Sequence, residues 1–502
     1  MRVSKSFGAF VTYGVISASA GMVMSASVAS KVVAAGEANP GEARTFNLQS
    51  RDGSQNTSGT QQTSSSSAAH DPGVRAGTPG AGVPLTTLSA DQLQFFQDGL
   101  SRFEETDSVS GGAASEPGTG LGPTFNSNSC GSCHAQPAIG GSSPSVNPQL
   151  TAATDNGATN SIPSFISADG PVREARFPFA LNSNGSVTQT PDGGVHALFT
   201  IAGRADAPGC SMAQPNFEQM GRLNNLIFRI PTPLYGAGLI ENIPEATIYA
   251  NMAANSQLKQ TLGIAGHPNL SGNDGTITRF GWKAQNKSTE AFAGEAYNVE
   301  MGVTNELFPT ERALPPATCM MNPTPEDSTN YPASGAGILS DVVAFANFMR
   351  FLAPPAPSSE GIPGNPPAQS VANGQAVFNQ VHCTMCHTPS MQTGASSFTP
   401  ALSNQSAPLY SDLLVHHMGA GLADNISQGS AGPDEFRTAP LWGVGQRLFF
   451  LHDGRATPTN GGLLTAIQEH AGNGSEANGV INLFQHLSNQ QKQDLLNFLR
   501  SL

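Results

Sequence analysis

Two copies of a Cys-x-x-Cys-His motif are the residues of this sequence with the most specific chemistry. They consist of Cys130, Cys133 and His134 in the first copy and of Cys383, Cys386 and His387 in the second. Two thiols at this spacing can add to the two vinyl groups of a haem as thioethers, and the adjacent histidine then lies beneath the iron. The motifs therefore predict two covalently bound haem c groups, each with its motif histidine as the proximal ligand.

A thiol redox pair and a zinc site are the alternatives for such motifs. A redox pair needs neither the adjacent histidine nor a second copy of the motif. A zinc site would need the two cysteine pairs, which are separated by about 250 residues, to converge on one ion. The two complete motifs favour haem over both alternatives.

The second axial ligand decides whether an iron transfers electrons or also binds a substrate, since an open position can bind peroxide or oxygen. The second half of the chain offers several candidates, which are His416, His417, Met418, His452, His470 and His486. After the first motif the candidates are His196 and His267, both far away in sequence. Lone histidines are more often packing or surface residues than ligands. The sequence therefore predicts an open position at the first haem.

Each motif follows a segment with helical periodicity that must position it. Gly99 and Phe103 precede the first motif, and Gly374 and Phe378 repeat the same Gly-x-x-x-Phe spacing before the second. Residues 89–92 read Ser-Ala-Asp-Gln, a capping box that predicts where the first of these helices begins.

Similar amphipathic segments close the two halves, at residues 347–352 and 497–502. An opening helix, a motif and a closing helix thus recur in the same order, which indicates a duplicated unit. We therefore expect a mainly α fold with two cytochrome c-like haem domains. The first domain is expected over residues 86–353, with a loop- and β-rich insertion at about 150–275. A Pro-rich linker at 354–367 then leads to the second domain at 368–502.

The N-terminal segment has the composition of a secretory signal. Arg2 and Lys5 precede an apolar, small-residue stretch at 7–29, so residues 1–35 are predicted to be a signal peptide. Residues 36–85 are rich in Ser, Thr, Gly, Gln and Pro, and we expect a disordered linker there. The protein is therefore expected to be periplasmic or otherwise exported, and no later segment is apolar enough to span a membrane.

The net charge of −13 argues against nucleic acid and anionic membranes as partners. It suits a small basic redox protein, although solubility is the simpler explanation; a quinol-linked electron donor is the other expected kind of partner. Cys210 and Cys319 lie outside the motifs and could form a disulfide in an oxidising compartment, but their spacing does not reveal whether their geometry permits it.

The sequence resembles the bacterial dihaem cytochrome c peroxidase superfamily, and within it the di-haem oxidoreductases once labelled thiol oxidoreductases. The likeness runs from about residue 88 to residue 502 and is carried by residues 125–134, 279–284 and 450–456. It implies that electrons pass from the C-terminal haem to an N-terminal haem that reacts with peroxide or another substrate.

The resemblance also implies roles for individual residues. Trp282, in Phe-Gly-Trp, is similar to a tryptophan that relays electrons between the haems, whereas the alternative is a core Trp. Glu300, in Glu-Met-Gly, is similar to a glutamate that acts on bound peroxide, whereas the alternative is an exposed helix Glu. His470 occupies the place of the distal ligand of the second haem, and Met418 is the alternative ligand.

Two departures from the family pattern affect these expectations. The peroxidases usually have a Gln between the Trp and the Glu, but residues 288–293 contain none, and Gln285 lies closer to Trp282 than the pattern asks. Their distal His soon after the first motif is also missing from residues 135–150. The first departure argues against efficient peroxidase chemistry, and the second agrees with an open first haem. A calcium ion occurs between the domains of related peroxidases, but no ligand cluster in this sequence supports one.

Three functions are therefore open at the level of sequence. The first is an enzyme that reduces peroxide or oxidises a substrate at the first haem, with Trp282 and Glu300 in the roles given above. The second is a non-enzymatic dihaem electron carrier. The third is the oxidative modification of a partner protein or polymer.

Overall fold

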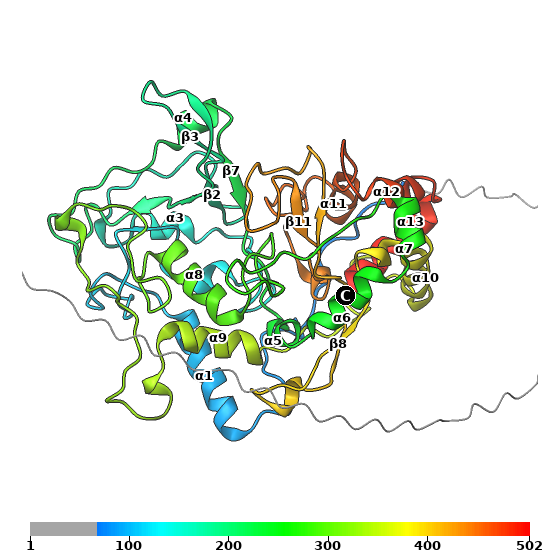
Figure 1. The fold of residues 1–502 in the computed structure, drawn as a ribbon, viewed down its shortest axis with the longest axis horizontal. Coiled ribbons are helices and arrows are strands. Elements are labelled where there is room, and N and C mark those ends of the chain that lie inside the picture. Colours follow the sequence, from blue (N-terminus) through cyan, green and yellow to red (C-terminus); the bar gives the residue numbers. More distant parts are fainter. Residues whose placement is uncertain (1–67) are drawn as a thin grey trace, which may run out of the picture. The chain divides into compact units, whose positions relative to one another are not determined.

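The computed structural model describes residues 68–502, so the predicted signal peptide and most of the predicted linker lie outside the described residues. Helices dominate the regular structure, and loops join them to small sheets of two or three strands (Figure 1). The mainly α class predicted from the sequence is therefore confirmed. Within residues 68–502, no helix is both long and apolar enough to cross a bilayer.

Helix α1 (Ala90–Glu104) packs against α9 (Asp341–Phe351), and both belong to the first half of the chain. The predicted capping box is present, because the Ser89 side chain accepts a hydrogen bond from the backbone N–H of Gln92 at 3.2 Å. Gly99 lies at the crossing, where a Cβ atom would clash with the carbonyl oxygen of Ala344. The glycine therefore lets the two helix backbones approach closely.

Helices α10 (Ala368–Gln380) and α13 (Asn489–Ser501) repeat this arrangement in the second half. A Cβ atom at Gly374 would clash with the carbonyl oxygen of Asp494. The phenylalanine one turn further along each opening helix lies beside a motif histidine. The ring centroids are 5.9 Å apart for Phe103 and His134 and 6.3 Å apart for Phe378 and His387. In each half, the glycine of the Gly-x-x-x-Phe spacing thus allows two helices to pack closely, and the phenylalanine lies beside the motif histidine.

The remaining α-helices are shorter, except for α8, which has 13 residues like α10 and α13. They are α2 (Cys130–Cys133), α3 (Gln149–Ala152), α4 (Phe217–Arg222), α5 (Ala237–Glu241), α6 (Glu245–Ala253), α7 (Ser256–Leu262), α8 (Thr289–Met301), α11 (Gly462–Glu469) and α12 (Asn478–Gln485).

The strands are also short, and all the pairs are antiparallel. They are β1 (Thr124–Phe125), β2 (Glu174–Arg176), β3 (Phe179–Leu181), β4 (Val187–Pro191), β5 (Val195–His196), β6 (Phe199–Thr200), β7 (Ile227–Arg229), β8 (Met391–Gln392), β9 (Ser406–Ala407), β10 (Val415–His417) and β11 (Glu435–Arg437). The three-stranded sheet has the order β5-β2-β7, and it places Glu174 directly opposite Arg229.

The segment at 68–85 differs from the prediction of a disordered linker up to residue 85. Asp71 forms an ion pair of 2.7 Å with Arg500, whose side chain is fully buried. The backbone N–H of Arg75 donates to Gly445, and that of Leu85 donates to Phe351. Composition alone missed this order, because a few long-range polar contacts hold the segment instead of an apolar core of its own.

Cys210 and Cys319 form a disulfide with an S–S distance of 2.01 Å. It links a loop between β6 and α4 to a turn between α8 and α9, which lie 109 residues apart. The structure thus settles the pairing that the spacing of the two cysteines left open.

Candidate haem-binding sites

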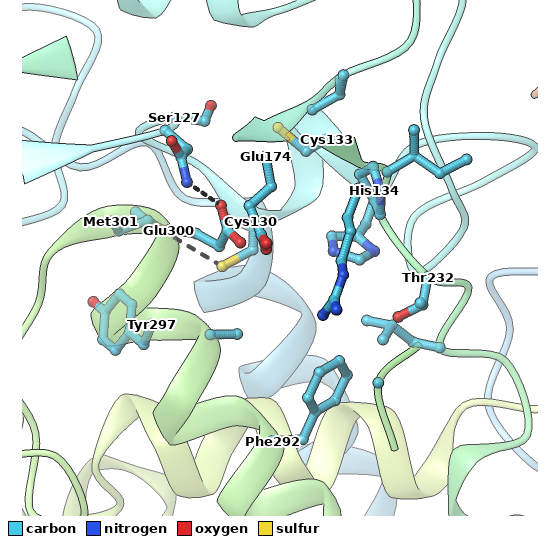
Figure 2. Close-up of a pocket in the computed structure, with 18 of the residues that line it drawn as sticks. Ser127, Cys130, Cys133, His134, Glu174, Thr232, Phe292, Tyr297, Glu300 and Met301 are labelled. Carbon is cyan, nitrogen blue, oxygen red and sulfur yellow. Dashed lines mark hydrogen bonds between the residues drawn. The ribbon is translucent and has the colours of Figure 1, made fainter. Parts of the chain in front are cut away.

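The first motif lines a cavity of about 1050 Å³, counting the part that is open to solvent. Cys130 and Cys133 begin and end α2, and His134 follows directly, so all three side chains reach this cavity (Figure 2). The Nδ1 atom of His134 donates to the carbonyl oxygen of Gly141 at 3.0 Å. Burial lowers the pKa of His134 to about 4. The ring is therefore neutral, with the lone pair on Nε2 available to bind a metal.

Glu300 lies in the last turn of α8, and its carboxyl group lines the same cavity. Its Oε2 atom accepts a hydrogen bond of 2.8 Å from the side-chain amide of Asn126. Glu174, from β2, points to the same place, so two carboxyl groups lie side by side (Figure 2). Burial and the neighbouring Glu174 raise the pKa of Glu300 well above its usual value. The half-buried position in the cavity wall contradicts the alternative of an exposed helix glutamate.

Gln285 lines the first cavity as well, although it lies too close to Trp282 for the family pattern. A tight turn explains its position, since Gly281 and Ala284 both have positive φ and the Ala284 N–H donates to Gly281. The turn folds the chain back and brings the amide into the cavity wall. Its Oε1 atom is buried and has no partner among the described residues. Spacing along the chain could not reveal this placement.

Trp282 lines both the first cavity and the cavity of the second motif, and it is the residue that the two described walls share. Its indole N–H donates to the carbonyl oxygen of Ile230 at 2.9 Å, which fixes the plane of the ring. The His452 ring approaches it edge-on, with the centroids 6.4 Å apart. Trp282 thus contributes to the walls of two cavities that each contain a motif.

The second cavity encloses about 1490 Å³, again counting the part open to solvent, and Cys383, Cys386 and His387 line it. His387 repeats the geometry of His134, since its Nδ1 atom donates to the carbonyl oxygen of Tyr410 at 2.9 Å. Burial lowers its pKa to about 4, so this ring also has a free lone pair on Nε2.

Both candidate distal ligands, His470 and Met418, line the second cavity. His470 follows the last turn of α11, and its Nδ1 atom donates to the carbonyl oxygen of Ala466 at 2.7 Å. Burial lowers its pKa, which leaves a neutral imidazole that can bind iron. This fixed tautomer favours His470, although the structure brings both residues to the site.

The other candidate histidines are less suitable as ligands. His416 lines the second cavity, but its two ring nitrogens bind Asp412 at 3.0 Å and Glu476 at 2.7 Å. These hydrogen bonds occupy both nitrogens and leave no lone pair for iron. His452 is in the wall of the second cavity, where it stacks on Phe436 with the centroids 4.3 Å apart. The other four line neither cavity, namely His196, His267, His417 and His486.

Unpaired arginine atoms test whether the two cavities fit haem. Arg173 lines the first cavity with a buried Nε atom that has no partner among the described residues. Arg437 and Arg447 line the second cavity with buried, unpaired guanidinium atoms. Burial lowers the pKa of both to about 10, so both stay cationic. Haem propionates are carboxylates that would pair with such groups, so the residues present fit haem. Isolated arginines carry no sequence motif, which is why they were missed.

Known protein families and solved structures include matches to this chain. The family described as "Di-haem oxidoreductase, putative peroxidase" matches residues 187–502, a range that includes Trp282, Glu300 and the second motif. No curated protein matches the chain. Among solved structures, a hydrazine synthase of Kuenenia stuttgartiensis has 14% identity and a TM-score of 0.32, covering 90% of this chain and 100% of its own. A MauG-like protein associated with microbial copper homeostasis has 18% identity and a TM-score of 0.23, covering 34% and 54%. The match over residues 187–502 shows that the chain belongs to the di-haem oxidoreductase family.

Proposed function

We propose that this protein is an exported dihaem c-type oxidoreductase that reduces peroxide at the first motif. Its two haem c groups are held by Cys130, Cys133 and His134 and by Cys383, Cys386 and His387, in two cytochrome c-like domains of which the first carries the insertion. Electrons from a small redox protein or a quinol-linked donor arrive at the second cavity, where His470 would bind the iron together with His387. They pass through Trp282 to the first cavity.

The position of Trp282 in the walls of both cavities carries this proposal. An indole ring that contacts both sites shortens the distance that an electron must cross through saturated side chains. The hydrogen bond to Ile230 and the edge of His452 hold the ring in place. A non-enzymatic electron carrier would need no separate reactive cavity with acid and base groups.

The first cavity contains the groups that peroxide chemistry needs. When bound, haem would supply an iron at which peroxide can react. Glu300 is half-buried in the cavity wall, and its carboxyl group can take part in proton transfer to a peroxide oxygen. Gln285 offers an unpaired carbonyl oxygen in the same wall, which can accept a hydrogen bond from the substrate. The presence of this amide removes the main argument from the sequence against peroxidase chemistry.

Replacement of each of the two tryptophans tests the proposal, because the chain has only Trp282 and Trp442. Half-reduced protein is mixed with hydrogen peroxide, and stopped-flow absorbance follows the oxidation of the second haem. We expect Trp282→Phe to slow this oxidation about tenfold or more, equivalent to about 1.4 kcal/mol of barrier. Trp442→Phe is the matched control and should react like the wild type, because Trp442 lines neither motif cavity.

Two results would contradict the proposal in different ways. Equal rates in the wild type and Trp282→Phe would show that electrons do not pass through this ring. A wild-type protein that is inert to peroxide, with low-spin spectra at both haems, would support the alternative function of a dihaem electron carrier.

A further inference from the structure

Glu174 is a charged group of the first cavity to which neither a motif nor the family match assigns a role. It begins β2, and its side chain is largely buried, with 17% of its surface exposed. Its carboxyl group lies beside that of Glu300 (Figure 2), and the two groups shift each other's pKa. The family match begins at residue 187, so Glu174 also lies outside the matched range.

Cations surround the Glu174 side of the carboxyl pair. Arg176, two residues along the same strand, binds Glu174 directly with its Nε atom. Arg229 lies opposite Glu174 on β7, where it is itself paired with Asp424 at 2.6 Å. Although burial opposes the charge, these two arginines lower the pKa of Glu174. Glu174 is therefore the ionised member of the pair.

The Glu300 side of the pair differs in its neighbours. Asn126 donates a neutral hydrogen bond to Glu300. Arg312, from the loop after α8, lowers the pKa of Glu300 by its charge, and Arg176 also acts on Glu300 but pairs directly with Glu174. The first-motif thiol of Cys130 is close by and brings no positive charge. Two carboxylates in contact cannot both be ionised at low cost, so the member with weaker cationic support retains the proton.

We propose, on the basis of the function proposed above, that Glu174 and Glu300 share one proton and act together as the acid–base pair of the first cavity. Glu300 holds the proton and is the acid. Glu174 accepts a hydrogen bond from it and is the base. Arg176 is a positioning residue that keeps Glu174 ionised.

The pair lets both proton movements of peroxide cleavage occur without a change in its total charge. Glu174 accepts a proton from one peroxide oxygen while Glu300 donates its proton to the other. The O–O bond breaks, the second oxygen leaves as water, and the pair still holds one proton. Two electrons delivered through Trp282 and two protons from solvent convert the first oxygen to a second water. A lone glutamate would have to be deprotonated first and protonated later.

Infrared spectroscopy of the haem-loaded protein tests the pair without relying on activity. At neutral pH the spectrum should contain a C=O stretch of protonated Glu300, which is identified as the component that Glu300→Gln removes. Asp107 should contribute a component that remains in this variant, because burial and neighbouring carboxylates raise the pKa of Asp107 to about 8. In Glu174→Gln the Glu300 band should titrate about one pH unit or more lower than in the wild type, because the neighbouring negative charge is gone. Glu218→Gln is the control on α4, where the carboxylate is 77% exposed and pairs with Arg222.

The pH dependence of peroxide reduction is the second measurement. The wild type should have a bell-shaped profile, whose limbs report the loss of the Glu300 proton and the protonation of Glu174. Glu174→Gln should lose the acidic limb and react at least tenfold more slowly, whereas Glu218→Gln should match the wild type. If Glu174→Gln fails to fold, Glu174→Asp serves instead. The Glu300 band of Glu174→Asp should titrate at a pH as high as in the wild type, because the aspartate retains the negative charge beside Glu300.

An unchanged titration of the Glu300 band in Glu174→Gln would overturn the proposal. So would the absence of that band from the wild type at neutral pH. A wild type that shows the expected band and its shift but does not react with peroxide would refute the proposed function and leave the shared proton standing.

Discussion

At the scale of single residues, the hydrogen bonds of three imidazoles decide their chemistry. His134, His387 and His470 each donate Nδ1–H to a backbone carbonyl, at 3.0, 2.9 and 2.7 Å. Such a bond fixes the tautomer and the orientation of the ring, and it raises the basicity of the other nitrogen. His416 lacks this arrangement because two carboxylates hold both of its nitrogens. The second cavity therefore contains, besides His387, a second histidine whose backbone hydrogen bond leaves Nε2 free to bind iron.

Replacing His470 tests this assignment against Met418. We expect His470→Ala to convert the ferric second haem from low spin to high spin, because the iron loses its sixth ligand. Absorption and electron paramagnetic resonance spectra measure this change. Met418 lines the same cavity, so Met418→Ala is the matched control, and the spectrum of this variant should stay low spin. The reverse outcome would identify Met418 as the ligand.

At the scale of elements, two glycine-centred helix crossings position the motifs. Gly99 lets α1 approach α9, and Gly374 lets α10 approach α13. In each pair, the phenylalanine four residues later contacts the motif histidine. A shift of the opening helix would move the phenylalanine ring that packs beside the motif histidine. The helix crossing therefore affects the position of the histidine.

Gly374→Ala should therefore damage the second site as well as stability. The added methyl group would clash with the backbone of α13, and such overpacking costs about 1–3 kcal/mol of unfolding free energy. Denaturant titration measures the loss, and the haem-to-protein ratio reports the effect on the site. Gly272→Ala is the control, because its Cβ atom would meet nothing within 4 Å. Equal unfolding free energies of Gly374→Ala and Gly272→Ala would show that α10 and α13 can move apart without a measurable loss of stability.

At the scale of the whole described chain, a buried ion triad links residues that are far apart in sequence. Asp424 binds Arg229 at 2.6 Å and Lys283 at 3.0 Å, and all three side chains are almost fully buried. Arg229 lines the first cavity, and Lys283 follows Trp282. Burial opposes ionisation of Asp424, but its two cationic partners lower its pKa. The triad thus joins the second half of the chain to the segment between the cavities.

Asp424→Asn should lower the unfolding free energy by about 3–5 kcal/mol at neutral pH, because two buried cations lose their counter-charge. A lowered pKa contributes stability that is present above the unfolded value and is lost as the pH falls through the folded value. The difference between variant and wild type should therefore shrink below about pH 4. Denaturant titrations across this pH range measure it. Asp274→Asn, at an exposed pair with Lys287, is the control and should change the unfolding free energy far less. A pH-independent difference would contradict the ion-pair explanation.

The sequence by itself determined the features whose chemistry is local. The two motifs need only five consecutive residues each, and the capping box at Ser89 needs four. The repeated Gly-x-x-x-Phe spacing predicted two equivalent helices, and the structure contains both. These patterns are readable because neighbouring residues along a helix or loop fix their own geometry, whatever the rest of the chain does.

Only the tertiary structure decided which distant side chains meet. Glu174 lies 126 residues before Glu300, and Gln285 enters the same wall through a tight turn. Arg437 and Arg447 reach the second cavity without any motif, and Asp71 orders a segment that its composition predicts to be disordered. The physical reason is that burial, partner charge and cavity shape arise from contacts across the fold, and these contacts leave no spacing pattern in the sequence.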